Sequence, residues 1–339
     1  MNNQSPILVS IIVVVYNVEP YLRECLDSLI NQTFHEIEII CVYDRSKDSS
    51  LSILQKYADN DKRIKIIERP INDGLPTARN VGMSHAEGKY IFFLDSDDYC
   101  DTDLCRKVLE CAETNQADLV IYDYVVFYSV EDLNANRKKS STLVSLNPSD
   151  RSSLLKIGAF AWTKMIRSDL VHSLNLKFPI GLSYEDMPVH WQLVTRAKKI
   201  ALLPERLCFY RQHNSSLSYR RDWYIADRVM TYDIVRNFLI SQNLYETYQD
   251  IFLESELDVF CWLCETINVP DRDRMMALIK GRLKEEHWAY INSSKPLSWR
   301  TRDFFREMRG SYSAKARRAL WFFARDCYRS MKRLRSYTS

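Results

Sequence analysis

The stretch Tyr90-Ile-Phe-Phe-Leu-Asp-Ser-Asp-Asp98 decides how the first part of the chain folds. Five consecutive apolar or aromatic residues are typical of a strand that is buried on both faces, as in a parallel sheet. Asp95, Asp97 and Asp98 follow this run at once. Because ligands bind outside the carboxyl ends of parallel strands, the stretch predicts a buried strand that delivers an acidic turn to a binding edge.

Strands and helices are expected to alternate through the first 128 residues. The predicted strands are 7–16, 37–43, 64–67, 90–94 and 119–128, and the predicted helices are 19–32, 48–57, 76–86 and 103–115. Runs rich in β-branched residues mark the strands, and apolar residues three or four positions apart mark the helices. Such alternation predicts an α/β fold in which helices flank a mostly parallel sheet.

The rest of the chain differs in composition. Residues 129–150 are polar and are expected to form an exposed loop or an insertion, and residues 151–222 are rich in Trp, Tyr and His. From residue 223 onward the pattern is mostly helical. We therefore expect three parts, which are residues 1–128, 129–222 and 223–339.

Composition places the chain among ordinary globular proteins, with 46% apolar and 27% charged residues in a length of 339. No apolar run reaches the roughly 18–20 residues of a membrane-spanning helix, and the first residues lack the basic region of a signal peptide. A cytoplasmic location is therefore expected. The nine cysteines are predicted to be reduced, and the pair Cys261 and Cys264 is expected to pack on a helix rather than to bind metal.

Charge is distributed unevenly along the chain. Residues 296–339 hold twelve Lys and Arg against three Asp and Glu, a net charge of +9, so the other 295 residues carry −6. Apolar residues at helical spacing in 316–334 predict a basic amphipathic helix that lies on an anionic membrane, peripheral to the inner face. A helix docked on the protein is the alternative. The acidic body argues against a nucleic-acid partner.

Two common phosphate-binding motifs, GxGxxG and GxxxxGK[ST], are missing from the sequence. Their absence argues against nicotinamide-dinucleotide and P-loop chemistry. An acidic cluster at a strand end can instead hold a divalent cation, Mn2+ or Mg2+, that neutralises diphosphate oxygens. Helix capping is the competing interpretation, but three carboxylates packed together without a cation would repel one another.

Several blocks, specific in combination, resemble glycosyltransferase family 2, a family of inverting enzymes with the GT-A fold. The resemblance covers roughly residues 7–220. The matching blocks are residues 15–22, 72–82, 88–98, 161–165, 184–187 and 209–216. It implies a GT-A domain, Rossmann-like, followed by a helical C-terminal region. It also implies a nucleotide-sugar half in residues 1–128 and an acceptor half with the catalytic base in residues 129–222.

The resemblance implies a set of donor-binding residues. They are Tyr16, Asn17, Glu19, Asp44, Arg79, Asp95, Ser96 and Asp97. Asp44 stands where the family bonds the pyrimidine edge, although its neighbours Tyr43 and Arg45 depart from the usual pattern. Asp97 is the implied metal ligand, and His213 stands at a position that can approach the metal or the diphosphate.

The resemblance also implies the acceptor side of the site. Trp162, Lys164 and Arg211 are the implied acceptor-binding residues, with Thr163 in place of the usual Asn. A single displacement needs one carboxylate to take the proton of the acceptor hydroxyl. Asp186 is the expected base, and its neighbour Glu185 is the alternative. His190, four residues beyond Asp186, is expected to be an ordinary packing residue.

The expected reaction moves a hexose or N-acetylhexosamine from a nucleotide diphosphate sugar to a hydroxyl group. UDP is the family's usual carrier, and a glycan or lipid-linked acceptor of bacterial surface polysaccharide or lipopolysaccharide is implied. Two alternatives remain open at this point. One is a nucleotidyltransferase that acts on a sugar phosphate, although Tyr16-Asn-Val-Glu19 is not its usual Gly-rich loop. The other is a non-catalytic subunit that binds the sugar nucleotide.

Overall fold

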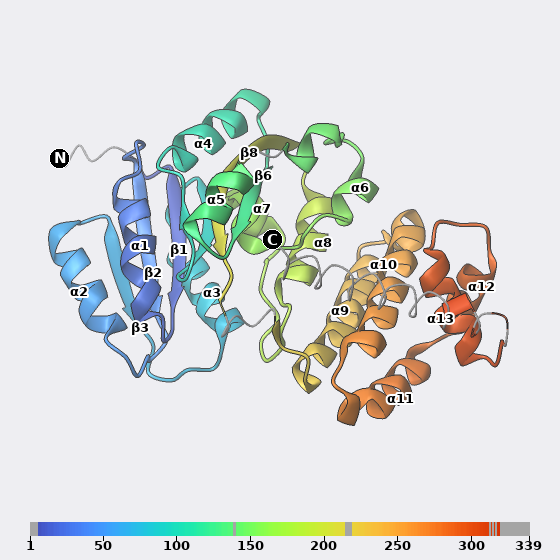
Figure 1. The fold of residues 1–339 in the computed structure, drawn as a ribbon. Coiled ribbons are helices and arrows are strands. Elements are labelled where there is room, and N and C mark those ends of the chain that lie inside the picture. The colour runs from blue at the N-terminus through green and yellow to red at the C-terminus, as the bar shows by residue number, and fades with distance from the viewer. Residues whose placement is uncertain are drawn as a thin grey trace. The chain divides into compact units, whose positions relative to one another are not determined.

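The computed structural model describes residues 6–137, 140–213, 219–311, 313, 315, 317 and 318. The chain divides into two compact units, residues 1–219 and residues 220–339, whose elements are labelled in Figure 1.

A mixed sheet forms the centre of the N-terminal unit. Its described strands are β1 (Val9–Val15), β2 (Ile37–Tyr43), β3 (Ile64–Glu68), β4 (Tyr90–Asp95), β5 (Tyr99–Cys100), β6 (Leu119–Phe127), β7 (Lys164–Arg167) and β8 (Ile200–Arg211). They are ordered β3-β2-β1-β4-β7-β6-β8-β5. The first four are parallel, β7 runs antiparallel between β4 and β6, and β6 and β8 are again parallel. The prediction of a mostly parallel sheet is confirmed.

Helices cover both faces of this sheet, which explains its continuous apolar strands. They are α1 (Glu19–Ile30), α2 (Ser50–Asn60), α3 (Leu75–Ser84), α4 (Leu104–Asn115), α6 (Arg151–Leu155), α7 (Ser168–Ser173) and α8 (Asp186–Arg196). Val13 of β1 packs in the main core with residues of α1, α2 and α4. Ile12 faces α3, where a Cβ on Gly82 would lie 2.4 Å from its Cγ2 atom. Glycine at this position therefore allows α3 to pack closely on the sheet.

Residues 129–150 are not the plain loop that the sequence predicts. They contain α5 (Val130–Arg137) and a 3-10 turn, η1 (Thr142–Ser145), which begins after Ser141 accepts a hydrogen bond from the Leu143 amide. Leu133 is buried beside Phe127, and Leu143 is buried as well. These two apolar side chains find partners on the sheet, which sets local structure in an otherwise polar segment.

The C-terminal unit is helical within its described residues, as the sequence predicts. Its helices are α9 (Asp227–Ser241), α10 (Tyr245–Thr266), α11 (Arg272–Arg282), α12 (Glu285–Asn292) and α13 (Trp299–Met308), with short 3-10 turns at 223–226 and 269–271. Cys261 and Cys264 are buried on α10, where the sequence predicts that they pack. Within the part of the chain described here, none of the helices combines the length and the apolar character that a membrane crossing requires.

The basic C-terminal helix predicted for 316–334 lies almost entirely outside the described residues. Two of its arginines are described, and both are engaged in ion pairs. Arg317 donates to Asp303 at 2.6 and 2.7 Å, and Arg318 donates to Glu307 at 2.6 Å and to Glu265 at 2.9 Å. These two guanidinium groups therefore stabilise the helical unit.

Candidate active site

The acidic turn follows β4 directly, as the sequence predicts. The amide of Asp98 donates to the carbonyl of Asp95 at 3.0 Å, which closes the turn. Asp98 is buried and accepts a 2.7 Å hydrogen bond from the Arg211 amide, so it joins the turn to the end of β8. Burial, with Asp97 and Asp95 nearby, raises the pKa of Asp98 well above its usual value. Ser96 is buried between the aspartates.

Asp97 and His213 meet although 116 positions separate them. Nε2 of His213 lies 3.0 Å from Oδ2 of Asp97, and the imidazole stacks on Tyr21 with ring centroids 4.9 Å apart. Burial raises the pKa of Asp97, and Asp95 raises it further, while His213 lowers it. The raised pKa means that the ionised form of Asp97 is disfavoured, and a bound cation would stabilise that form.

This pair fits one mode of metal binding. Among the described residues, no group of three or more His, Cys, Asp and Glu is placed to hold a metal ion by itself. Mg2+ commonly takes only one or two protein carboxylates and completes its shell with water and substrate phosphates. Asp97 and His213 would supply a carboxylate oxygen and an imidazole nitrogen to a shared site of this kind.

Arg79 of α3 connects the two halves of the site. Its Nη2 donates to Oδ1 of Asp95 at 2.8 Å, and its Nη1 donates to Oε1 of Glu185 at 2.7 Å. The guanidinium is buried over Phe178, 5.3 Å from the ring centroid. Burial lowers its pKa, but Asp95, Glu185 and Asp186 raise it above the usual value. Arg79 therefore holds the acidic turn and the start of α8 together.

Glu185 and Asp186 occupy the N-terminus of α8 and differ in environment. Glu185 is 6% exposed and is bound to Arg79, whereas Asp186 is half-buried. Burial raises the pKa of Glu185 to about 7, with Arg79 opposing and Asp186 adding to the rise. The preceding Tyr184 has a φ of 59°, in the left-handed region that costs energy for a bulky side chain. The turn into α8 is therefore held in an uncommon backbone conformation.

The loops after β1 and β2 are tied to each other. The Lys47 amide donates to Oδ1 of Asn17 at 2.8 Å, and the Ser49 amide donates to Oε2 of Glu19 at 2.9 Å. In return, the Glu19 amide donates to Asp48 at 2.9 Å. Asn17 and Glu19 thus shape the rim of the expected nucleotide site, and the side chain of Tyr16 is exposed beside them.

Asp44 has a partner that sequence reasoning missed. Nη1 of Arg69 donates to Oδ1 of Asp44 at 2.6 Å, and Arg69 also binds Asp73. Burial raises the pKa of Asp44, while the Arg69 charge lowers it. Arg69 lies directly after β3, and that position at the carboxyl edge of the sheet is the sequence signal that could have identified it.

Two of the three predicted acceptor residues are buried. Trp162 is 3% exposed and stacks on Phe160. Lys164 is 1% exposed, and its Nζ donates to the carbonyl of Phe160 at 2.6 Å. Burial lowers the pKa of Lys164 to about 7, although Asp186 opposes this. Neither side chain is presented to solvent in this structure, so their role in acceptor binding stays a prediction.

Arg211, the third predicted acceptor residue, lies against the acidic turn. Its Nε donates to the carbonyl of Asp97 at 3.0 Å, its Nη2 binds Glu24, and its guanidinium lies 4.9 Å from the Phe127 ring centroid. In these contacts Arg211 supports the turn. His190, on α8, is buried with Nε2 3.1 Å from the Leu154 carbonyl, as expected for a packing residue.

Comparison with known proteins identifies the family. The profile described as "Glycosyl transferase family 2" matches residues 10–175. The putative glycosyltransferase EpsH of Bacillus subtilis (strain 168) is 33% identical over 266 residues, which are 76% of this chain and 75% of EpsH. The chain therefore belongs to glycosyltransferase family 2. It is a glycosyltransferase, and the two alternative functions find no support here.

Further comparisons agree with this family and with the fold. The uncharacterized glycosyltransferase EpsJ of Bacillus subtilis (strain 168) is 36% identical over 220 residues, 62% of this chain, and the match spans 63% of EpsJ. The crystal structure of S. aureus TarS 1-349 in complex with UDP-GlcNAc superposes with a TM-score of 0.69 at 20% identity, covering 89% of this chain and 87% of that one. The predicted GT-A fold with a helical C-terminal region is confirmed.

Proposed function

We propose that this chain is an inverting glycosyltransferase that transfers a hexose or N-acetylhexosamine from a UDP-sugar to a hydroxyl group. The acceptor is a glycan or lipid-linked intermediate of bacterial surface polysaccharide or lipopolysaccharide. The observation that carries the proposal is the Arg79 bridge, with hydrogen bonds of 2.8 Å to Asp95 and 2.7 Å to Glu185. Through this bridge, the acidic turn adjoins the start of α8.

The donor is proposed to bind across the carboxyl ends of β1, β2 and β4. The tied loops that contain Asn17 and Asp44 surround the base and ribose, and the acidic turn faces the diphosphate. A UDP-linked donor is supported by the UDP-GlcNAc that TarS binds in its complex. A divalent cation, Mn2+ or Mg2+, held by Asp97 and His213 would neutralise charge on the leaving diphosphate.

Asp186 is the proposed base. Glu185 is committed to Arg79 and is more deeply buried, whereas Asp186 is half-buried at the first position of α8. Asp186 takes the proton of the acceptor hydroxyl as that oxygen forms its bond to the anomeric carbon. The bond from the anomeric carbon to the diphosphate oxygen breaks on the opposite face, and the electron pair leaves with the nucleoside diphosphate. One displacement inverts the configuration.

The three parts predicted from the sequence are proposed to divide this work. Residues 1–128 bind the donor, residues 129–222 bind the acceptor, and residues 223–339 form the helical region. Trp162 and Lys164 are buried, so they would affect acceptor binding indirectly, by holding the 158–163 segment in place. Lys164 donates hydrogen bonds to the carbonyl of Phe160 and, at 3.4 Å, to that of Gly158. A cytoplasmic location at an anionic membrane surface, reached through the tail, remains part of the proposal.

Donor hydrolysis tests the proposal. A panel of sugar nucleotides is first screened by thermal shift with Mn2+, because a bound donor raises the melting temperature by mass action. Hydrolysis of the selected donor is then compared for wild type, Asp97→Ala and the exposed-surface control Asp59→Ala. We expect Asp97→Ala to lose metal-dependent turnover and the control to retain it. Equal activity of Asp97→Ala and wild type would refute the metal role.

A further inference from the structure

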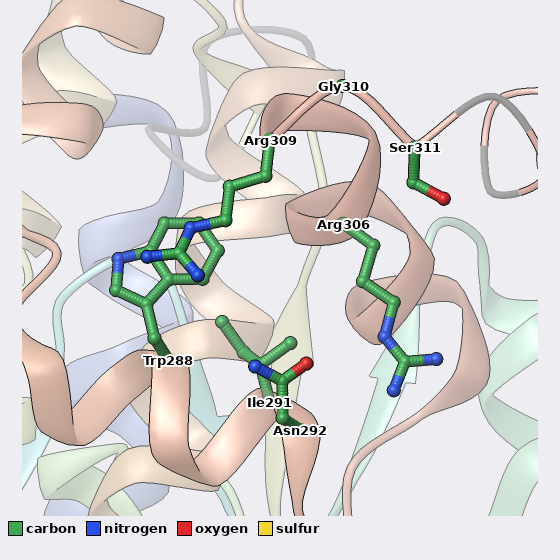
Figure 2. Close-up of a pocket in the computed structure, with 7 residues that line it drawn as sticks. All are labelled: Trp288, Ile291, Asn292, Arg306, Arg309, Gly310 and Ser311. Carbon is green, nitrogen blue, oxygen red and sulfur yellow. The ribbon is translucent and has the colours of Figure 1, made fainter.

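A pocket in the C-terminal unit has a lining unlike that of the proposed active site. It lies between α12 and the end of α13 and has a volume of about 300 Å³. Figure 2 shows Arg306 and Arg309 extending from α13 toward α12 on either side of Ile291 and Asn292. Trp288 forms one wall of the pocket. None of the described residues that line it is acidic.

The two arginines differ from Arg317 and Arg318 because, among the described residues, no carboxylate forms a hydrogen bond or ion pair with them. Both acidic residues of α13 are already bound, since Asp303 accepts from Arg317 and Glu307 accepts from Arg318. Within the described part of the chain, neither Arg306 nor Arg309 forms a hydrogen bond or ion pair through its guanidinium group. Among the described residues, the pocket therefore holds two guanidinium groups that form no ion pair, although Arg306 interacts electrostatically with Asp303 at longer range.

The ends of two helices offset these two positive charges only in part, because each end supplies about half a negative charge. Both α12 and α13 end at the pocket, and the C-terminus of a helix carries about half a negative charge on its last carbonyl groups. Those of α13 are occupied, because the amides of Gly310 and Ser311 donate to the carbonyls of Glu307 and Arg306. On α12, Arg302 donates to the carbonyl of Ile291.

One of the two guanidinium groups is held in place. That of Arg309 lies 4.0 Å from the centroid of the Trp288 ring, in a cation–π contact. Stacking of this kind orients a guanidinium while leaving its N–H groups at the edge available to an oxyanion. Because the side chain is already ordered, less entropy is lost when a ligand binds.

We propose that this pocket binds the phosphate group of a phosphate ester. Two guanidinium groups on opposite sides of an amide match a tetrahedral oxyanion with several acceptor oxygens. Trp288 and Ile291 offer apolar surface to the carbon skeleton that carries the phosphate, and 300 Å³ is at the small end of ligand pockets. The site is separate from the transfer reaction, and its occupant is a phosphodiester chain or a lipid headgroup.

The test uses the full-length protein in EDTA, so that no metal-dependent donor site contributes. Ligand-observed NMR measures the binding of glycerol 3-phosphate and of inorganic phosphate, with glycerol as the neutral control. We expect both phosphates to bind and glycerol not to bind. Arg306→Gln with Arg309→Gln should weaken binding about tenfold for each lost charge-assisted contact. Failure of both phosphates to bind at millimolar concentration overturns the proposal.

The matched control is the double variant Arg272→Gln with Arg274→Gln. It removes the same charge from α11, where both side chains are exposed and Arg274 stacks on Trp223 at 3.6 Å. We expect it to bind glycerol 3-phosphate as wild type does. An equal loss in both double variants would mean general charge attraction rather than a site. Donor hydrolysis should be unchanged in both, which separates this proposal from that of the transferase.

Two further arms identify the source of the phosphate. Oligo(glycerol phosphate) represents a polymer, and phosphatidylglycerol vesicles, with phosphatidylcholine as control, represent a membrane. Loss of oligomer binding in the Arg306/Arg309 double variant supports the site and assigns it to a phosphodiester chain. Loss of flotation with the anionic vesicles supports the site and assigns it to a headgroup. If the double variant behaves as wild type in both arms and with glycerol 3-phosphate, the pocket is not a phosphate site.

Discussion

Two buried arginines, one in each unit, each bind two carboxylates, and yet their surroundings differ. Arg79 in the N-terminal unit bridges Asp95 and Glu185. One further carboxylate, Asp186, also interacts with it, so three carboxylates share this one guanidinium group. The side chain of Asp95 is 31% exposed, which leaves the cluster open on one side.

Arg236 in the C-terminal unit belongs to a closed network. It binds Glu256 at 2.9 Å and also Glu286. His287 lies 2.8 Å from Glu256, and the Tyr245 hydroxyl donates to Glu286 at 2.7 Å. Burial raises the pKa of Glu286, but Tyr245 and Arg236 lower it below its usual value. Each carboxylate in this network has at least two partners.

The difference between the clusters agrees with the role proposed for the Arg79 cluster as part of the active site, whereas the Arg236 cluster stabilises the helical unit. In the Arg79 cluster, burial raises the pKa of Glu185 to about 7 and raises that of Asp97, so the folded chain disfavours these ionised groups. In the Arg236 cluster, the carboxylate of Glu286 is stabilised. Carboxylates with an uncompensated electrostatic cost are typical of functional sites, because a ligand can supply the missing charge.

The largest expected effect concerns the proposed base. Asp186→Asn should lower kcat by about 10²–10⁴-fold, since an amide cannot accept the proton of the acceptor hydroxyl. Steady-state kinetics with a selected donor and acceptor measures this. Glu256→Gln, in the closed network, is the comparison variant and should keep kcat per folded molecule. An Asp186→Asn enzyme with more than a tenth of wild-type kcat would remove Asp186 from the mechanism.

The second prediction compares the effects of removing Arg79 and Arg236 on stability and on turnover. Arg236→Met should lower the free energy of unfolding by about 3–5 kcal/mol, because it leaves buried carboxylates without a cation. The turnover of Arg236→Met per folded molecule should equal that of wild type. Arg79→Met should abolish turnover, since Asp95 and Glu185 lose the group that joins them. Urea unfolding and donor hydrolysis on the same samples distinguish the two outcomes, and loss of turnover in Arg236→Met would break the comparison.

The clusters should also respond oppositely to pH. The folded pKa of Glu185, about 7, is above its unfolded value, so its stabilising contribution is present below about pH 4.5 and is lost as pH rises through 7. Wild type should therefore lose up to about 3 kcal/mol between pH 5 and pH 8 relative to Glu185→Gln. Unfolding free energies of both proteins across this range measure the loss, and parallel curves would contradict it.

Glu286 serves as the control of opposite sign. Its folded pKa is lowered, so its stabilising contribution is present above the unfolded pKa and is lost as pH falls through the folded value. Glu286→Gln should therefore be less stable than wild type at pH 7, with a difference that shrinks in acid. For Glu185→Gln, the free energy of unfolding should rise relative to that of wild type as the pH becomes more alkaline. The same pH dependence in both variants would contradict the assignment of the two clusters.

The smallest expected effect tests whether Asn17 supports the rim of the open cluster. Asn17→Ala removes the acceptor of the 2.8 Å hydrogen bond from the Lys47 amide and places alanine at a φ of 51°, so it should cost about 2 kcal/mol of stability. Asn17→Asp keeps an oxygen at that position and should keep the stability. Thermal unfolding measures both. If the two variants are equally stable, the hydrogen bond does not hold the loop.

The elements that the sequence predicts correctly are those with a local hydrophobic pattern. The run from Tyr90 to Leu94 and the buried strands around it predict the parallel part of the sheet, because hydrophobic periodicity reports on burial over a few residues. Residues 129–150 show the limit. Their polar composition predicts a loop, but Leu133 and Leu143 are buried and accompany helical structure there. The burial of Leu133 and Leu143 depends on contacts with strands that are distant in the sequence.

The amino-acid sequence by itself determined the α/β order of the first 128 residues, the acidic turn and the family. Only the tertiary structure decided how the charges combine. Arg79 and Glu185 are 106 positions apart, and no local pattern pairs them. In the sequence, nothing distinguishes Arg306 and Arg309 from other basic residues. In the structure, the acidic residues of α13 are paired with Arg317 and Arg318. The physical reason is that hydrophobic spacing acts along a segment, whereas compensation of charge depends on which segments the fold brings together.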